Sequence, residues 1–248
     1  MLLKKILKEI LSIPVVIFRF QNLKRGSILM YHSVGLNTKF STVTPTEFEK
    51  QIQYLLNKKY KIIRLADVVE SITQGQSLDK CVALTFDDGY LDFYSCVFPL
   101  LKKYKIPASV FVATDYIGKE MRTKQGHVFQ IISESQIKEM ISSGYVDVMP
   151  HTKTHPKLSN ITHKDGVDEI IESQSVLTRI SGRICNIFAY PFGNYTPEIV
   201  SYLEDSPKWI AAVTVKKGYI SSDSPLFLLP RNSIDSEVGM MQFRCLIR

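Results

Sequence analysis

The chain has 248 residues, of which 45% are hydrophobic and 22% are charged, a balance typical of a globular protein with a substantial core. The formal net charge is +7, but no dense run of lysine and arginine is interleaved with aromatic residues, so the sequence argues against nucleic-acid binding. The excess of positive charge instead suits an anionic membrane surface, an acidic glycan or simply a solvated basic surface.

Residues 1–25 are predicted to form a separate N-terminal amphipathic segment. Leucine and isoleucine recur there at helical spacing, lysines occupy the opposite face, and Pro14 ends the pattern. The apolar stretches are too short to span a bilayer, and no small-residue cleavage site follows them. Residues 1–20 could therefore lie on a membrane surface or pack on their own domain. The missing cleavage site favours a cytoplasmic protein, with contact at the inner membrane face or an uncleaved export signal as alternatives.

From residue 26 to residue 248, short apolar runs alternate with segments of helical periodicity. The expected strands are 27–31, 61–63, 81–86, 108–113, 145–149, 187–190, 209–215 and 226–229. The expected helices are one that begins at Pro45, then 65–74, 91–103, 134–143, 167–180 and 197–204. Repeated βα units predict an α/β domain with a parallel sheet, and their number is close to that of a barrel.

Polar residues that can carry chemistry follow several of the expected strands. They are His32, Asp87, Asp88, His151 and Arg231. In folds built from parallel strands, active-site residues gather at the C-terminal ends of the strands. We therefore expect these side chains to lie at one end of the sheet.

Asp87 and Asp88 form the first candidate site. Two adjacent carboxylates after a buried strand repel each other unless something, such as a divalent cation, neutralises them. Neighbouring residues of an extended chain point in opposite directions, so one Asp is expected to bind an ion while the other acts as a base. The alternative is an Asp-Gly turn with one spare charge.

His151 and His155 form the second candidate site. Two histidines four positions apart meet on one face if the backbone makes a helical turn, which suits two imidazoles on one metal ion. The alternative is a polar loop with two exposed histidines. Together with one Asp they would make an Asp-His-His site with open positions, for which zinc is favoured and cobalt, nickel or manganese could substitute. An open position can hold a water and polarise an amide carbonyl, and a neighbouring carboxylate can take the proton of that water.

Three motifs resemble, in the same order, those of the polysaccharide deacetylases, the NodB-homology enzymes of carbohydrate esterase family 4. The motifs are Leu84-Thr85-Phe86-Asp87-Asp88-Gly89-Tyr90, His151-Thr152-Lys153-Thr154-His155 and Tyr190-Pro191-Phe192-Gly193. The opening segment Leu29-Met30-Tyr31-His32-Ser33 resembles the corresponding segment in the branch of the family that de-N-acetylates poly-N-acetylglucosamine. The resemblance extends from about residue 28 to about residue 234 and implies a distorted (β/α) barrel with about seven parallel strands.

The resemblance implies a role for each matching residue. Asp87 corresponds to the general base, and the backbone N–H of Phe192 to a donor that stabilises the oxyanion. The implied metal ligands are Asp88, His151 and His155. The implied activity is the metal-dependent removal of N-acetyl groups from an N-acetylated glycan or glycolipid, with release of acetate.

The general acid and the partner of the base depart from the family pattern. Many members use a His from a Leu-x-His motif near the C-terminus, but no His follows His163 here. In the exopolysaccharide branch, the resemblance implies a His at the position of His32 as the acid, and an imidazole suits protonation of a leaving amine. Many members also carry an Arg just ahead of the third motif, where this chain has Phe188-Ala189. Arg231 is predicted either to supply that charge or to be a surface residue.

The sequence leaves other functions open. A non-catalytic carbohydrate-binding module on the same fold is disfavoured by the presence of Asp87 and His32, because binding alone needs neither. A serine esterase is disfavoured because the chain lacks a GxSxG elbow, while an O-acetyl esterase and a membrane-associated scaffold stay as alternatives. Exopolysaccharide, peptidoglycan and lipid-linked sugars all fit as substrates, and no pattern indicates the oligomeric state.

Overall fold

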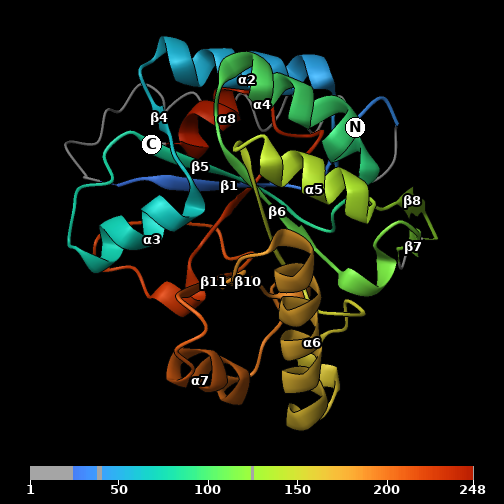
Figure 1. The fold of residues 1–248 in the computed structure, drawn as a ribbon. Coiled ribbons are helices and arrows are strands. Elements are labelled where there is room, and N and C mark those ends of the chain that lie inside the picture. The colour runs from blue at the N-terminus through green and yellow to red at the C-terminus, as the bar shows by residue number, and fades with distance from the viewer. Residues whose placement is uncertain (1–24, 38–40, 124–125, 248) are drawn as a thin grey trace.

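The computed structural model describes residues 25–37, 41–123 and 126–247, in which helices surround a central sheet of parallel strands (Figure 1). The strands are β1 (Ser27–Tyr31), β2 (Ser33–Val34), β3 (Thr42–Val43), β4 (Lys61–Ile62), β5 (Cys81–Phe86), β6 (Ala108–Val112), β7 (Glu120–Arg122), β8 (Val128–Gln130), β9 (Val146–Pro150), β10 (Ile187–Ala189), β11 (Ala211–Val213) and β12 (Asn232–Ser233). The α-helices are α2 (Pro45–Asn57), α3 (Leu65–Thr73), α4 (Phe98–Tyr104), α5 (Glu134–Ser142), α6 (His163–Ser181), α7 (Pro197–Asp205) and α8 (Met240–Leu246).

The largest sheet has six parallel strands in the order β12-β1-β5-β6-β9, with β4 also paired to β5. β4 pairs with the first residues of β5, at Cys81 and Val82, and β6 pairs with its last residues, at Thr85 and Phe86. β10 and β11 form a second parallel pair. Because parallel strands end at the same edge of a sheet, the loops that follow β1, β5 and β9 lie close together.

The C-terminal segment connects the two sheets. Leu229 bridges Val213 of β11, and three residues later Asn232 pairs with Leu29 of β1. On the other side, no ladder joins β9 to β10 within the described ranges. The predicted α/β fold with a parallel central sheet is therefore confirmed, whereas a continuous ladder around a barrel is not seen in that part of the chain.

Aromatic packing between the sheet and α2 holds the ends of the central strands. Tyr31 of β1 stacks on Phe86 of β5 with ring centroids 5.1 Å apart, and Phe48 of α2 meets Phe86 edge-on at 5.7 Å. All three side chains are fully buried. A second cluster, centred on Phe188, packs α7 against β10 and β11. These contacts make the strand ends a rigid base for the loops that carry the polar residues.

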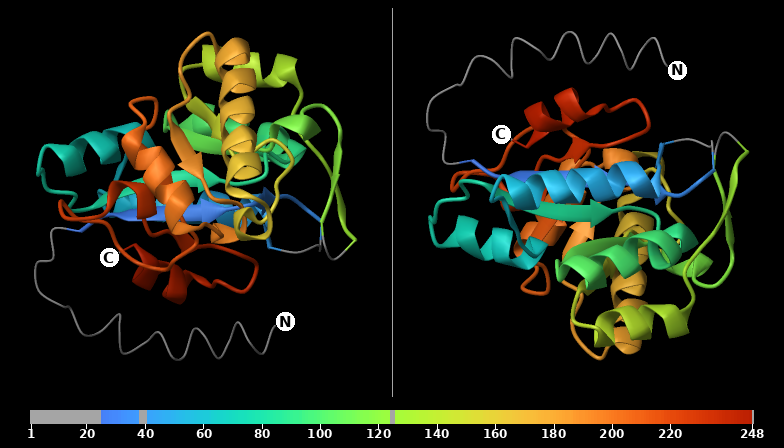
Figure 2. Two further views of the ribbon diagram at one scale, coloured as in Figure 1. Left: turned by 90° about the horizontal axis from the view of Figure 1, so that it is seen from below. Right: turned by 90° about the horizontal axis from the view of Figure 1, so that it is seen from above.

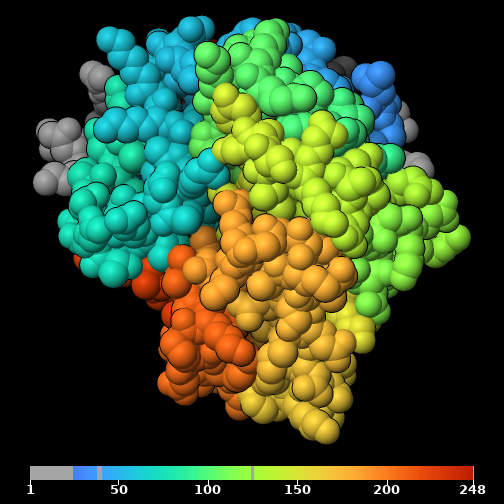
Figure 3. Space-filling view, in the orientation of Figure 1, coloured from blue at the N-terminus to red at the C-terminus, as the bar shows by residue number. Residues whose placement is uncertain are grey.

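Helices cover the sheet on opposite sides. In Figure 1, α2 and α4 lie above β1, while α6 and α7 lie below it. Tyr54 of α2 and Phe243 of α8 meet with ring centroids 6.3 Å apart. In the right view of Figure 2, α2 (blue) lies across the sheet and α8 (red) lies beside it. On the face drawn in Figure 3, side chains of α3, α5 and α6 are exposed beside those of α4 and α7.

The strand predicted at 226–229 is wrong. Leu226–Leu228 forms a 3₁₀ turn in which the Leu228 N–H donates to the Pro225 carbonyl at 3.0 Å. Proline presets the backbone angle that starts a turn, which explains why an apolar run here does not extend. The last strand is instead Asn232–Ser233, which is too short and too polar to show as a strand pattern.

The helix predicted at 91–103 is divided into two parts. Phe93–Val97 forms a π-helical turn, in which the Phe98 N–H donates to the Phe93 carbonyl, and α4 continues from there. Pro99 has no N–H to contribute to the helical ladder, which accounts for the change in hydrogen-bond pattern.

Helix α6 is longer than the predicted helix at 167–180, because it begins at His163. The Thr162 hydroxyl oxygen accepts a hydrogen bond from the Asp165 N–H at 3.2 Å and caps the first turn. That turn is polar, so the hydrophobic periodicity alone could not show where the helix starts.

The expected amphipathic segment, residues 1–25, lies outside the described residues except for Arg25. The start of the expected domain at residue 26 therefore stays a prediction. None of the helices in the described ranges is long and apolar enough to cross a membrane.

Candidate active site

The two adjacent carboxylates lie in a tight turn at the end of β5. The Asp87 N–H donates to the Tyr31 carbonyl at 2.9 Å and continues the strand pairing, and Asp88 and Gly89 then adopt left-handed φ values of 70° and 71°. A Cβ at Gly89 would lie 3.0 Å from a methyl group of Val112, so both the angle and the limited space favour glycine. The turn buries both carboxylates, with Asp87 3% and Asp88 6% exposed.

His151 and His155 meet through an irregular loop and not through the helical turn that we expected. Thr152 and His155 have left-handed φ values of 64° and 60°, and such angles cost about 1–3 kcal/mol each in residues other than glycine. The His155 N–H donates to the Thr152 hydroxyl oxygen at 3.0 Å. The loop brings the centroids of the two imidazole rings to 4.7 Å. Surrounding contacts must hold this strained path in place.

Asp88, His151 and His155 place three ligand atoms around one point. Asp88 Oδ1 lies 3.2 Å from His155 Nε2 and 3.6 Å from His151 Nε2, and the two Nε2 atoms are 3.1 Å apart. Ligand atoms around a tetrahedral zinc ion, at roughly 2.0–2.1 Å from it, lie about 3.3 Å from one another. The three atoms therefore have the spacing that one ion requires. In the part of the chain that the structure describes, no other group of three His, Cys, Asp or Glu side chains has this arrangement.

The charge states of this group also suit a cation. Burial raises the pKa of Asp88, but the hydrogen bond with His155 and the charge of that ring hold the pKa well below its usual range. Burial lowers the pKa of His151 to about 4, so its ring is neutral at pH 7. The His151 Nδ1–H donates to the Ala189 carbonyl at 2.8 Å, which leaves the Nε2 lone pair directed at Asp88 and His155.

Arg231 is buried and holds Asp87. Its side chain is 0% exposed. Arg231 is therefore not the surface residue that the sequence offered as one of two alternatives. Nη1 and Nη2 donate to the two Asp87 carboxylate oxygens at 2.7 Å and 2.6 Å, while Nε donates to the Thr214 carbonyl at 2.8 Å. Nη1 also donates to the Thr85 hydroxyl oxygen at 3.1 Å. This paired geometry sets the plane of the Asp87 carboxylate.

Asp87 is ionised in this environment. Burial raises its pKa, but the Arg231 guanidinium outweighs burial and holds the pKa below its usual range, with a smaller contribution from His151. Each oxygen of a carboxylate has a second lone pair beside the one that accepts from Arg231. Asp87 can therefore accept a proton from a group in the adjacent cavity while Arg231 keeps it oriented.

One cavity of about 580 Å³ connects the residues identified from the sequence. The predicted site residues that line it are His32, Asp87, Asp88, His151, His155 and Phe192. Arg231 does not line the cavity and contacts Asp87 from behind. The cavity also contains Arg122, Lys157 and Asp235, for which no sequence pattern suggested a role.

Phe192 occupies a turn directly beside the histidines. It has a left-handed φ of 58°, its side chain is 45% exposed, and its ring centroid lies 4.6 Å from that of His155. The ring therefore forms part of the wall next to the metal-ligand candidates. The role of the Phe192 backbone N–H as an oxyanion donor stays a prediction.

Asp92, which the sequence did not single out, binds the side chain of Ser33, the residue after His32. The Ser33 hydroxyl donates to Asp92 Oδ2 at 2.5 Å, and the Thr42 hydroxyl donates to Ser33 Oγ at 3.0 Å. Burial raises the pKa of Asp92 to about 6, although the hydrogen bond from Ser33 favours its charged form. In the sequence, the one hint that Asp92 lies near the site is its position four residues after Asp88.

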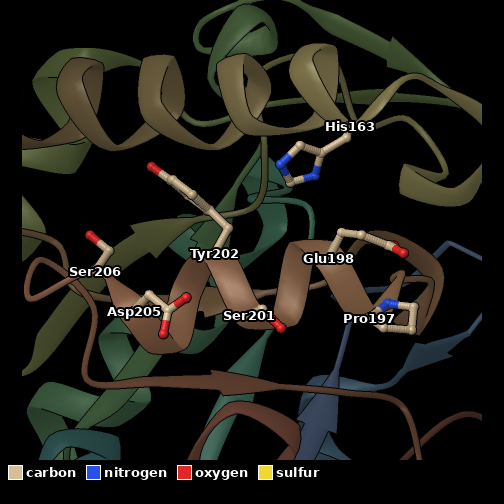
Figure 4. Close-up of a pocket in the computed structure, with 7 residues that line it drawn as sticks. All are labelled: His163, Pro197, Glu198, Ser201, Tyr202, Asp205 and Ser206. Carbon is tan, nitrogen blue, oxygen red and sulfur yellow. The ribbon is translucent and has the colours of Figure 1, made fainter.

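A second hollow, of about 640 Å³, lies along α7 and faces the first residue of α6 (Figure 4). Its lining residues are His163, Pro197, Glu198, Ser201, Tyr202, Asp205 and Ser206. None of them lines the cavity at the strand ends, and none belongs to the group of three ligand candidates. The chemistry is therefore assigned to the cavity at the strand ends.

Comparison with known families gives an independent result. The model of the polysaccharide deacetylase family matches residues 74–207. That range contains Asp87, Asp88, His151, His155 and Phe192, and it excludes His32 and Arg231.

Individual proteins are similar over more of the chain. The Bacillus subtilis protein YxkH, named as a polysaccharide deacetylase, is 31% identical over 205 residues, which cover 82% of this chain and 69% of that protein. A poly-beta-1,6-N-acetyl-D-glucosamine N-deacetylase of Staphylococcus aureus is 27% identical over 176 residues, 68% of this chain, and the match spans 59% of that enzyme. The structure of the Streptococcus pyogenes deacetylase PplD in complex with acetate has a TM-score of 0.79 and 25% identity, covering 90% of this chain and 98% of that one.

Metal-free protein is expected to lose stability as the pH falls from 6.5 to 4. The pKa of His151 is about 4 in the folded chain, against an ordinary value of 6.5, so in this window the unfolded chain binds more protons and is favoured as pH falls. The free energy of unfolding would be measured by urea denaturation at pH 6.5 and at pH 4. Between these two values it should decline by about 2–4 kcal/mol more in the wild type than in His151→Asn. His163→Asn, on the exposed start of α6, should retain the wild-type decline. An equal decline in all three proteins would contradict this assignment of His151.

Proposed function

Because this chain belongs to the polysaccharide deacetylase family, we propose that it is a metal-dependent hydrolase that removes N-acetyl groups from a glycan or glycolipid and releases acetate. The observation that carries this proposal is the convergence of the ligand atoms of Asp88, His151 and His155 beside Asp87 in one cavity. The names of two similar proteins support the substrate class, because one is an N-deacetylase of poly-beta-1,6-N-acetyl-D-glucosamine and the other is a deacetylase with bound acetate.

Asp88, His151 and His155 would hold the divalent ion, and their oxygen and imidazole donors suit zinc best, with cobalt, nickel or manganese as alternatives. When bound, the ion would polarise the acetamide carbonyl and lower the pKa of a water to about 7. Imidazoles bind a metal ion in their neutral form, so with an ion bound Asp88 would be the one ligand of the three that carries a negative charge. This donor set therefore leaves the site with positive charge at which an acetamide oxygen can bind.

Asp87 is the proposed general base, which takes the proton of the attacking water. It is ionised, it lines the cavity, and its two hydrogen bonds to Arg231 keep the carboxylate plane from rotating. Arg231 contributes by orientation, since it does not line the cavity. A correctly placed base contributes roughly 10²–10⁴-fold to such a reaction.

His32 is the proposed general acid. The amine of an amide is a poor leaving group until it gains a proton, and an imidazole can carry one near neutral pH. His32 lines the same cavity as Asp87, on the loop that follows β1. The hydrogen bond from the Ser33 hydroxyl to Asp92 fixes the side chain of the residue next to His32.

The backbone N–H of Phe192 is the proposed donor to the oxyanion that forms as water attacks the carbonyl. A donor of this kind lowers the barrier by roughly 2.7–4 kcal/mol in related acyl chemistry. Its position in a left-handed turn beside His155 supports this role. Because the donor belongs to the backbone, replacing the Phe192 side chain would not remove it.

A membrane-bound setting is also proposed. Residues 1–20 would contact a membrane surface through their apolar face, as their amphipathic pattern indicates.

Zinc-loaded protein should release acetate from an oligomer of N-acetylglucosamine, and a chelator that removes the ion should stop the release. Asp87→Asn should lower the rate about 10²–10⁴-fold, because an amide cannot accept the proton, while the zinc content stays at the wild-type level. Asp79→Asn, at an exposed position before β5, is the matched control and should retain full activity. A zinc-loaded wild type that releases no acetate from any N-acetylated sugar would sink the proposal in favour of a binding module, and release from O-acetylated sugars alone would indicate an esterase.

His32→Ala should separate two substrates that differ in their leaving group. The amine of an N-acetyl sugar needs protonation, whereas the phenolate of 4-nitrophenyl acetate departs without it. We expect acetate release from the sugar to fall about 10²–10⁴-fold and hydrolysis of the aryl ester to change little. His163→Ala should leave both activities intact. Equal losses on both substrates would show that His32 is not the acid.

A further inference from the structure

We infer that Glu169 is a positioning residue that holds the metal-binding loop in its ligand geometry, an inference that rests on the function proposed above. Glu169 lies on α6, is partly buried, and does not line the cavity. It therefore acts on the site only through the loop that connects His151 to His155.

One carboxylate binds the middle of that loop at three points. Glu169 Oε2 accepts hydrogen bonds from the backbone N–H groups of Lys153 and Thr154 at 2.8 Å and 2.7 Å. Glu169 Oε1 accepts from the Thr154 hydroxyl at 2.6 Å. Hydrogen bonds to an ionised acceptor are stronger than those between neutral groups, so this carboxylate replaces the backbone pairing that an irregular loop lacks.

The carbonyl groups of the same loop are bound from the opposite side. The N–H of Thr114 donates to the Thr152 carbonyl at 3.2 Å, and the N–H of Asp115 donates to the Lys153 carbonyl at 3.0 Å. The loop is thus held between the segment after β6, which binds its acceptors, and α6, which binds its donors. Only the α6 side depends on a single side chain.

The loop needs this support because its backbone is strained at both ends. Thr152 and His155 are the residues with left-handed φ values, and they flank the two N–H groups that Glu169 binds. If the loop relaxed toward ordinary angles, the His155 ring would turn away from Asp88 and His151. Glu169 therefore keeps His155 close to Asp88 and His151 in the metal-free protein, so that the three ligands are already in place when an ion binds.

Helix α6 is itself well anchored, so it can serve as a fixed support. Ile170, next to Glu169, is fully buried, and Gln174 Nε2 donates to the Cys185 carbonyl at 3.0 Å. Glu172 provides a comparison on the same helix. Among the residues that the structure describes, its half-exposed carboxylate pairs with the Lys153 side chain at 2.6 Å. That contact does not touch the loop backbone.

Glu169→Ala should weaken zinc binding about 10–100-fold, the usual cost of losing a group that orients metal ligands. The zinc Kd would be measured by competition with a chromophoric chelator, and circular dichroism of the metal-free protein would confirm the fold. Glu169→Gln keeps an oxygen that can accept the two backbone hydrogen bonds, so its Kd should lie between those of Glu169→Ala and the wild type. Glu172→Gln is the matched control and should bind zinc as the wild type does. A folded Glu169→Ala protein with an unchanged zinc Kd would overturn the inference.

A second measurement needs no variant, in case Glu169→Ala fails to fold. In metal-free wild-type protein, the amide hydrogens of Lys153 and Thr154 should exchange slowly with solvent, because Glu169 binds them without an ion. Fast exchange of both amides would overturn the inference. Neither readout involves turnover, so a wild type that binds zinc tightly but releases no acetate would end the proposed function and leave the role of Glu169 standing.

Discussion

Two adjacent buried carboxylates are the constraint on which the rest of the site depends. Neither Asp87 nor Asp88 can stay ionised in the interior without positive charge close by. Arg231 provides that charge to Asp87 through two hydrogen bonds. In the described ranges, the ion-pair contacts of Asp88 come only from His151 and His155, and His151 is neutral at pH 7. The remaining need for positive charge at Asp88 is the physical reason to place a cation there.

The same ion pair connects the catalytic chemistry to the fold. Arg231 lies between Leu229, which bridges β11, and β12, which pairs with β1, and its side chain also binds Thr214 and Asp87. The C-terminal segment is therefore held to three strands at the point where the proposed base must be oriented. Replacing Arg231 would leave a buried, unpaired carboxylate, so the orientation of the base and the packing of the strand ends depend on one residue.

Much of the fold and part of the site could be predicted because buried parallel strands leave a simple pattern. The run at 81–86 coincides with β5, and the polar residues Asp87 and Asp88 stand out directly after it. The site of Arg231 could not be decided, because its burial depends on Thr214 and on β5, which are distant in the sequence. Glu169 left no signal at all, since its partners become neighbours only when α6 packs beside the histidine loop.

Anomalous diffraction from zinc-loaded crystals tests the central claim most directly. We expect a single strong peak within about 2.0–2.3 Å of a carboxylate oxygen of Asp88 and of the Nε2 atoms of His151 and His155. The contradicting result has two parts: zinc binds in solution at a ratio of one per chain, and the crystal shows no peak among these three side chains. That result would contradict the assignment of this cavity as a metal-dependent active site.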